Sequence, residues 1–154
     1  MTQHTLPDEH IVKETASIIA VDPGREKTGV ALVAIKDSCL LRKAIVPTET
    51  VGKYCADLLG AYSAIERIVC GNGTNHQAVF KVLTEAAKEF GKEATLTDEK
   101  HTTEEARVRY FEWNPPKGLK RLIPKGMLYP PEPVDDFTAW VIGERYLNEK
   151  KLET

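Results

Sequence analysis

The chain has 154 residues, the length of one ordinary domain, and its 42% hydrophobic and 29% charged residues are typical of a globular protein. That much apolar material can form one sizeable core, so the fold needs neither disulfides nor a structural metal. A formal net charge of -2 excludes a global attraction to nucleic acid or anionic membranes, so any contact with a polyanion must come from a local basic patch.

The cellular location is predicted from what the sequence lacks. Its three cysteines lie far apart, with no CxxC spacing, which fits a reducing compartment. The first fifteen residues contain no apolar segment of the signal-peptide type. No apolar stretch approaches the roughly 18 residues that a membrane-spanning helix needs. We therefore expect a cytoplasmic protein with no membrane partner.

The predicted elements begin after a polar segment, residues 1–15, which is expected to form a loose tail or a short edge element. Three short runs rich in β-branched residues follow, separated by turn residues. Their brevity favours strands over helices, and their short linkers favour antiparallel pairing. The three predicted strands are Ser17–Val21, Gly29–Ile35 and Leu40–Val46.

From residue 48 onward the apolar pattern alternates between helical and strand spacing. It predicts in order a helix over 48–64, a strand over 67–70, a helix over 76–90, a strand over 93–97, a helix over 103–113, a basic proline-rich loop over 114–133 and a last helix over 134–147. The sequence thus predicts one α/β domain, residues 16–154. Its five-stranded mixed sheet has three antiparallel strands first, then alternating helices and strands, and helices flank it.

Acidic residues recur where predicted elements begin or end. Asp22 directly follows the first strand, Asp98 and Glu99 follow the last strand, and Asp135 and Asp136 open the last helix. If the two strands are neighbours, these carboxylates can converge outside the strand ends. Carboxylates brought so close repel one another unless a cation joins them, and hard oxygen ligands suit Mg²⁺ or Mn²⁺. Taken singly, each residue is also an ordinary turn residue or first-turn helix acid.

Four segments carry a family resemblance. IIAVDPGREKTGVALV resembles the first hairpin of RuvC-type Holliday-junction resolvases and of the YqgF family, both of RNase H-like fold. TDEKHTTEEA resembles the YqgF motif DER-x-TT, and VDDFTAWVIGERYL is similar to that family's closing helix. IVCGNGTN stands where the family has a glycine-bearing loop. The matches follow the family order and cover residues 16–147.

The resemblance implies a metal-dependent endonuclease that hydrolyses phosphodiester bonds of nucleic acid. It marks Asp22, Glu99 and Asp135 as catalytic metal ligands for Mg²⁺ or Mn²⁺, and Asp136 as a neighbour able to substitute or support. The family's arginine after the acidic pair is Lys100 here, which keeps the charge but loses the bidentate fork for a phosphate. The implied substrate is a ribosomal RNA precursor or branched DNA. A resolvase should be a homodimer, whereas an RNA-trimming enzyme can be a monomer.

Substrate-binding candidates lie in two loops near the predicted carboxylates. Arg25 and Lys27 in the hairpin loop can contact phosphates, or can be two solvated turn charges. In the GNGTN loop, Asn72 and Thr74 can donate hydrogen bonds to a nucleic-acid backbone. A simple strand-to-helix turn capped by Asn75 is the competing interpretation.

The loop over 114–133 interleaves basic and apolar residues, a composition that suits a grip on nucleic acid. Lys120 and Arg121 are its candidate binding residues, and a solvated surface loop is equally consistent with the pattern. Two other functions remain open. One is a non-catalytic nucleic-acid-binding module of the same fold. The other is an actin-like nucleotide-binding domain, which would need a second such domain around the nucleotide.

Overall fold

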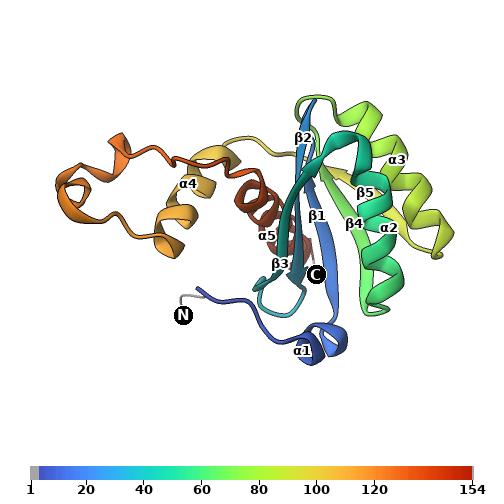
Figure 1. Cartoon of the computed structure of the whole chain (residues 1–154). Coiled ribbons are helices and arrows are strands. Elements are labelled where there is room, and N and C mark those ends of the chain that lie inside the picture. The colour runs from blue at the N-terminus through green and yellow to red at the C-terminus, as the bar shows by residue number, and fades with distance from the viewer. Residues whose placement is uncertain (1–3, 154) are drawn as a thin grey trace.

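The computed structural model describes residues 4–153 and contains a five-stranded sheet in the order β3-β2-β1-β4-β5 (Figure 1). The strands are β1 (Ser17–Asp22), β2 (Lys27–Ala34), β3 (Leu40–Pro47), β4 (Ile65–Gly71) and β5 (Glu93–Thr97). β2 pairs antiparallel with β1 and β3, whereas β4 runs parallel to both β1 and β5. The predicted five-stranded mixed sheet is confirmed.

The helices cover both faces of this sheet. They are α1 (Glu9–Glu14), α2 (Val51–Ala61), α3 (His76–Glu89), α4 (Thr102–Trp113) and α5 (Asp135–Glu153), with the 3₁₀ turns η1 (Thr48–Thr50), η2 (Gly118–Leu122) and η3 (Lys125–Met127). α2 and α3 pack on one face, and α5 packs on the other with α4 against it (Figure 1). Within residues 4–153, no helix combines the length and apolar character needed to cross a bilayer.

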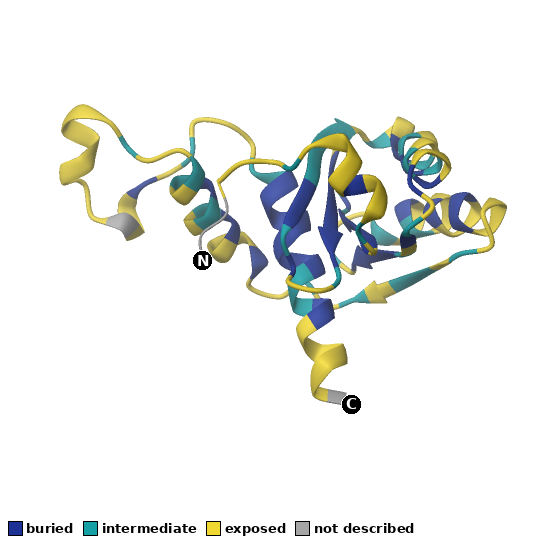
Figure 2. Cartoon of the chain, turned by 90° about the horizontal axis from the view of Figure 1, so that it is seen from below, coloured by how far each residue is buried: buried dark blue, intermediate teal, exposed yellow. Residues whose placement is uncertain are grey.

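Alternate residues of β1 belong to two separate cores. Ile19 and Val21 pack beneath α2 and α3, and Ile18 and Ala20 pack beneath α5. Figure 2 shows this burial concentrated in the central strands and the facing side of α5. Because β1 is covered on both faces, its apolar run is continuous rather than alternating. Its last residue, Asp22, therefore projects from one of the most firmly held strands.

The N-terminal segment differs from the prediction, because residues 9–14 form α1 rather than a loose tail or an edge element. Val12 is completely buried in the core beneath α2. Glu9 accepts a hydrogen bond of 2.8 Å from the Tyr62 hydroxyl and forms an ion pair of 3.0 Å with Arg42. These partners are distant in the sequence, so the polar composition alone did not reveal them. Residues 1–3 of the expected tail lie outside the described residues.

Two helices have bounds that differ by several residues from the spacing-based expectation. The first predicted helix begins as η1 and ends at Ala61, three residues early. The last helix runs to Glu153, six residues beyond the predicted end at Leu147. That extension carries no apolar pattern and is largely exposed (Figure 2). Between α4 and α5, residues 114–133 leave the body of the sheet as a projecting loop (Figure 1).

Candidate functional site

β1, β4 and β5 are parallel and bring their carboxyl ends to the same end of the sheet. Val21 pairs with Cys70 across β1 and β4, and Gly71 pairs with Thr97 across β4 and β5. Asp22, at the end of β1, therefore lies level with the ends of its parallel neighbours. In open α/β sheets, ligands collect outside such strand ends.

Asp22 is the most perturbed carboxyl group at this end of the sheet. Its pKa is raised to about 8, first by burial and then by the negative charges of Glu99 and Asp135. Asp22 also shares a hydrogen bond with the Glu99 carboxyl group. Two carboxyl groups can share a hydrogen bond only if one is protonated, and the raised pKa keeps that proton on Asp22 near neutral pH.

Glu99 reaches Asp22 by a route that the sequence did not predict. The condition set for their convergence, that the strands before Asp22 and Glu99 are neighbours, is not met, because β4 lies between β1 and β5. Glu99 crosses the end of β4 over Gly71 and Gly73, where a Cβ atom would overlap the Glu99 carboxylate. The two glycines therefore supply the space that lets a residue two positions beyond an edge strand reach the centre of the sheet.

The backbone around Glu99 is fixed by hydrogen bonds from three directions. Its amide donates to Asn72 Oδ1 at 3.3 Å, and the Asn72 amide donates to the Thr97 carbonyl at 3.0 Å. The Thr102 hydroxyl donates to the Glu99 carbonyl at 2.7 Å at the start of α4. Arg145, on α5, donates to the carbonyl of the residue after Glu99. Asn72, predicted to bind substrate, is thus engaged in holding Glu99.

One oxygen of the Glu99 carboxylate is buried without a conventional donor. Among the described residues, Glu99 Oε2 has no hydrogen-bond partner. Burial raises the pKa of Glu99, and the bond with Asp22 opposes that rise. A buried oxygen that lacks a donor carries a desolvation cost, which a bound cation would remove.

Asp135 arrives from the opposite face of the sheet, in the first turn of α5. The start of α5 sits directly on Gly29 of β2, where a Cβ atom would overlap the Asp135 carbonyl. Burial raises the pKa of Asp135, and the positive charge of Lys27 opposes the rise. Lys27 therefore lies close enough to act electrostatically on this carboxylate, although its own side chain is exposed.

Asp136, predicted as a supporting metal ligand, has both of its carboxylate oxygens bound by protein groups. It is buried, with Oδ2 3.0 Å from Lys43 Nζ and Oδ1 accepting a hydrogen bond of 2.9 Å from the Phe137 amide. Both oxygens are already engaged, so Asp136 fastens the start of α5 to β3. That contact in turn helps to place the neighbouring Asp135.

The hairpin turn beside Asp22 is tied to two other loops. The Gly24 carbonyl accepts hydrogen bonds from the Thr48 hydroxyl at 3.0 Å and from Asn75 Nδ2 at 3.2 Å. Asn75 is the N-cap residue of α3, as the competing interpretation had it, but it adopts a left-handed conformation and its side chain makes no capping bond to the helix. Arg25 and Lys27 project from this fixed turn into solvent.

The other predicted binding residues lie on exposed loops. Thr74 is exposed beside Gly73, and Lys100 is exposed directly after Glu99. Lys120 and Arg121 lie on η2, beyond the C-terminal end of α4, whereas Glu99 precedes its N-terminal end. Since α4 has 12 residues, about 18 Å of helix separates those two ends. The structure therefore does not bring Lys120 and Arg121 to the carboxylates.

The converging carboxylates interact strongly without forming a ready ligand cage. Within residues 4–153, no three His, Cys, Asp or Glu side chains are already placed so that they could hold one ion. The electrostatic coupling of Asp22 with Glu99 and Asp135 nevertheless shows that these three acids share one region. Small side-chain rotations would alter the ligating geometry but not which backbone elements meet.

Several residues that shape this site were missed from the sequence. Gly29, Gly71 and Gly73 supply close approach rather than a functional group, and Arg145 acts from the middle of α5. The glycines do stand beside predicted site residues in the sequence, and that adjacency was the available signal. Nothing in the local sequence around Arg145 indicates its contact with the loop that follows β5.

Comparison with known proteins finds likeness in structure only. No protein-family model matches the sequence, and no curated protein matches it significantly. The Thermus thermophilus RuvC structure superposes with a TM-score of 0.62 at 14% identity, over 90% of this chain and 97% of that one. T. thermophilus RuvC in complex with a Holliday junction substrate gives 0.59 at 14% identity, over 88% and 95%.

A second kind of nuclease shares the same architecture. The large terminase nuclease from the thermophilic phage G20c gives a TM-score of 0.50 at 11% identity, over 86% of this chain and 82% of that one. Together with the strand order, these similarities show that the chain has the RNase H-like fold predicted from its sequence. At such low identity they establish the fold, and the chemistry has to be inferred from the site.

Proposed function

We propose that this protein is a divalent-metal-dependent endonuclease, which hydrolyses phosphodiester bonds of nucleic acid at Asp22, Glu99 and Asp135. The observation that carries the proposal is the convergence of three acids from β1, the loop after β5 and the start of α5, where burial and then the charges of Glu99 and Asp135 raise the pKa of Asp22 to about 8. Perturbed acids gathered at strand ends are typical of functional sites.

The donor set fits Mg²⁺ or Mn²⁺. All three side chains offer hard carboxylate oxygens, which these ions prefer. The buried Glu99 Oε2 has no hydrogen-bond donor among the described residues. Gly71 and Gly73 leave the space that lets the Glu99 carboxylate face Asp22. When bound, a divalent cation activates water for attack and stabilises the negative charge of the leaving oxygen. Asp136 is not included in this ligand set, because Lys43 and the Phe137 amide occupy its oxygens.

The chain's own residues would divide the remaining work. Asp22 sets the position of the site from a strand buried on both faces, while Glu99 and Asp135 hold its two sides. Lys27 already acts electrostatically on Asp135 and can attract a neighbouring phosphate, together with Arg25 in the same turn. Thr74 and Lys100, exposed on the loops beside Glu99, are the other candidate phosphate contacts.

The proposed substrate is branched DNA or structured RNA. Branched DNA is supported by the likeness to RuvC, one of whose structures is a complex with a Holliday junction substrate. A ribosomal RNA precursor is supported by the resemblance of TDEKHTTEEA to the YqgF motif. The first would require a homodimer that cuts two strands symmetrically, and the second is open to a monomer. In either case we place the nuclease domain at residues 16–154 and the protein in the cytoplasm.

The deciding experiment is a cleavage assay with a matched pair of carboxylate variants. Wild type, Asp22→Asn and Asp57→Asn would be incubated with Mg²⁺, Mn²⁺ or EDTA. The labelled substrates would be four-way DNA junctions, duplex DNA, single-stranded RNA and a ribosomal RNA precursor fragment. Asp57 is an exposed acid on α2, paired with Lys53, and serves as the control. We expect metal-dependent cutting that Asp22→Asn abolishes and Asp57→Asn preserves.

Two results would count against the proposal. Cutting that survives both EDTA and Asp22→Asn would place the chemistry elsewhere. Folded wild-type protein that binds these substrates but cuts none of them with either metal would favour a non-catalytic binding module of the same fold.

A further inference from the structure

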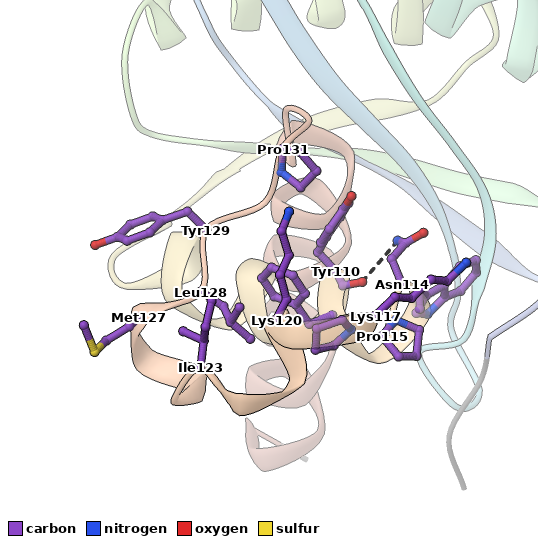
Figure 3. Close-up of a pocket in the computed structure, with 13 residues that line it drawn as sticks. Tyr110, Asn114, Pro115, Lys117, Lys120, Ile123, Met127, Leu128, Tyr129 and Pro131 are labelled. Atoms are coloured by element: carbon purple, nitrogen blue, oxygen red, sulfur yellow. Dashed lines mark hydrogen bonds between the residues drawn. The ribbon is translucent and has the colours of Figure 1, made fainter.

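A hollow lies at the C-terminal end of α4, enclosed by the loop over residues 114–133 (Figure 3). Its volume is 620 Å³, within the roughly 300–1,000 Å³ of small-ligand sites. It is separate from the carboxylates, which lie at the other end of α4. Nothing in the proposed chemistry at Asp22, Glu99 and Asp135 makes use of it.

The floor of the hollow is aromatic and firmly supported. Phe111 and Trp113 are half-buried, each packed on the core beneath α5 while also lining the hollow. The Trp113 ring makes T-shaped contacts with the rings of Phe137 and Trp140, with ring centres 5.8 and 6.0 Å apart. Such contacts hold the ring in place, and aromatic rings accept offset-stacked as well as T-shaped partners.

The wall of the hollow is a loop that exposes large apolar side chains. The loop is fastened to α4 where Arg107 donates to the Leu128 carbonyl at 2.6 Å. Among the residues that line the hollow, Met127 is 68% exposed and Tyr129 is 74% exposed. Figure 3 shows Tyr129 and Met127 pointing away from Tyr110 and Asn114, at the outer rim. Apolar side chains gathered beside a hollow in this way mark a binding surface.

The charge of the hollow selects an anion. Lys117 and Lys120 line it, and no acidic residue of the described chain lines it. Glu132, which is not a lining residue, accepts a hydrogen bond of 3.2 Å from the hydroxyl of Tyr110, which is one. The hollow thus combines flat aromatic faces with positive charge.

We propose that this hollow binds an unpaired nucleotide of the substrate, stacking its base on Phe111 and Trp113 and pairing its phosphates with Lys117 and Lys120. Stacking on aromatic side chains beside basic residues is how proteins hold single strands. A fully paired duplex hides its base faces and presents phosphates, so it would leave the aromatic floor unused. The proposal rests on the proposed nuclease function and specifies that function's substrate as one with an unpaired segment.

The spacing along α4 sets where the unpaired segment should lie. About 18 Å of helix separates the carboxylate end of α4 from the hollow. At 3.4 Å per nucleotide of a helical strand, that is about five nucleotides, or fewer in an extended strand. The unpaired base should therefore lie within about five nucleotides of the bond that is cut.

The test measures binding without cutting, in the Asp22→Asn background. The probe is a duplex with a five-nucleotide unpaired flank that carries 2-aminopurine, made in DNA and in RNA, and compared with the same duplex without a flank. Phe111→Leu keeps an apolar side chain but removes the ring, and Lys117→Gln/Lys120→Gln removes the charge. Phe90→Leu and Lys88→Gln are matched controls, because both residues are exposed at the end of α3 on the opposite face of the sheet.

We expect the flanked duplex to bind about tenfold more tightly than the blunt duplex, with quenching of 2-aminopurine, the size expected from base–aromatic stacking. Phe111→Leu and the double lysine variant should bring the affinity ratio towards one, whereas the controls should keep it. An equal affinity for flanked and blunt duplexes, or a ratio unchanged by Phe111→Leu, would overturn the proposal. Metal-dependent cutting by wild type is scored separately, so failure of the hollow and failure of the nuclease site are distinguishable.

Discussion

Replacing Asp22 by asparagine should make the protein more stable, and more so as the pH rises. Asparagine keeps the shape of the side chain but cannot ionise. In the wild type, burial and the charges of Glu99 and Asp135 raise the pKa of Asp22 to about 8 from an ordinary value of 3.8. The folded protein therefore holds this proton more tightly than the unfolded chain does, and stability is lost between those two pKa values as the pH increases.

The size of the effect follows from the shift. Each pKa unit corresponds to about 1.36 kcal/mol, and between pH 5 and pH 8 the unfolded Asp22 is ionised while the folded group resists ionisation. The upper limit over that interval is about 4 kcal/mol. The pKa values of Glu99 and Asp135 are raised as well, so these groups take up part of the proton that the folded protein holds. We therefore expect the difference in unfolding free energy between variant and wild type to grow by less than the limit, but by at least about 2 kcal/mol.

The assay is urea unfolding at pH 5, 7 and 9 in the presence of EDTA, for wild type, Asp22→Asn and Asp57→Asn. Groups that do not interact with Asp22 cancel in the difference, so the comparison isolates Asp22 and the carboxyl groups coupled to it. Asp57 is exposed on α2, and its variant should differ from wild type by a nearly constant amount. A stability gap for Asp22→Asn that stays flat or shrinks from pH 5 to pH 9 would refute the reasoning.

Three further changes have expected outcomes. Gly73→Ala places a methyl group on the Glu99 carboxylate and should slow cutting about a hundredfold, whereas Gly126→Ala, in open space, should not; equal rates would show that Glu99 does not need the space left by Gly73. Lys43→Met leaves the buried Asp136 unpaired and should cost about 2 kcal/mol in urea unfolding, recovered in the double variant with Asp136→Asn; no recovery would exclude the ion pair as the cause. Adding Mg²⁺ at a hundred times its Kd should stabilise the wild type by about 2.7 kcal/mol. Thermal melting should show a much smaller stabilisation of Asp22→Asn by the same addition.

The fold was largely predictable because its central strands are covered on both faces. Continuous apolar runs such as Ser17–Val21 have few alternatives to a buried strand, and the short linkers between the first three runs allow little besides antiparallel pairing. The N-terminal helix was not predictable in the same way. Its place depends on Glu9 meeting Tyr62 and Arg42, contacts that span 53 and 33 residues.

The candidate site was predictable as a set of acids but not as a geometry. Asp22, Glu99 and Asp135 could be chosen because each adjoins the end or start of an element. The passage of Glu99 across β4 could not be foreseen, since it depends on a strand order in which Gly71 happens to lie beneath it. The ion pair of Asp136 could not be foreseen for a similar reason, because its partner on β3 lies 93 residues away.

β5 is an edge strand, whereas β1 is the central strand of the sheet. The part of the site that carries Glu99 should therefore unfold locally more easily than the part that carries Asp22. No residue of β5 is fully buried, whereas β1 is buried along its length up to Asp22. Amide protons of an edge strand exchange with solvent through local unfolding at a lower free energy than those of a central strand. A ligand that binds both Asp22 and Glu99 must therefore link the edge strand β5 to the central strand β1 and oppose the local unfolding of β5. Slower hydrogen exchange in Glu93–Thr97 would then report occupancy of the site, independently of any product formed.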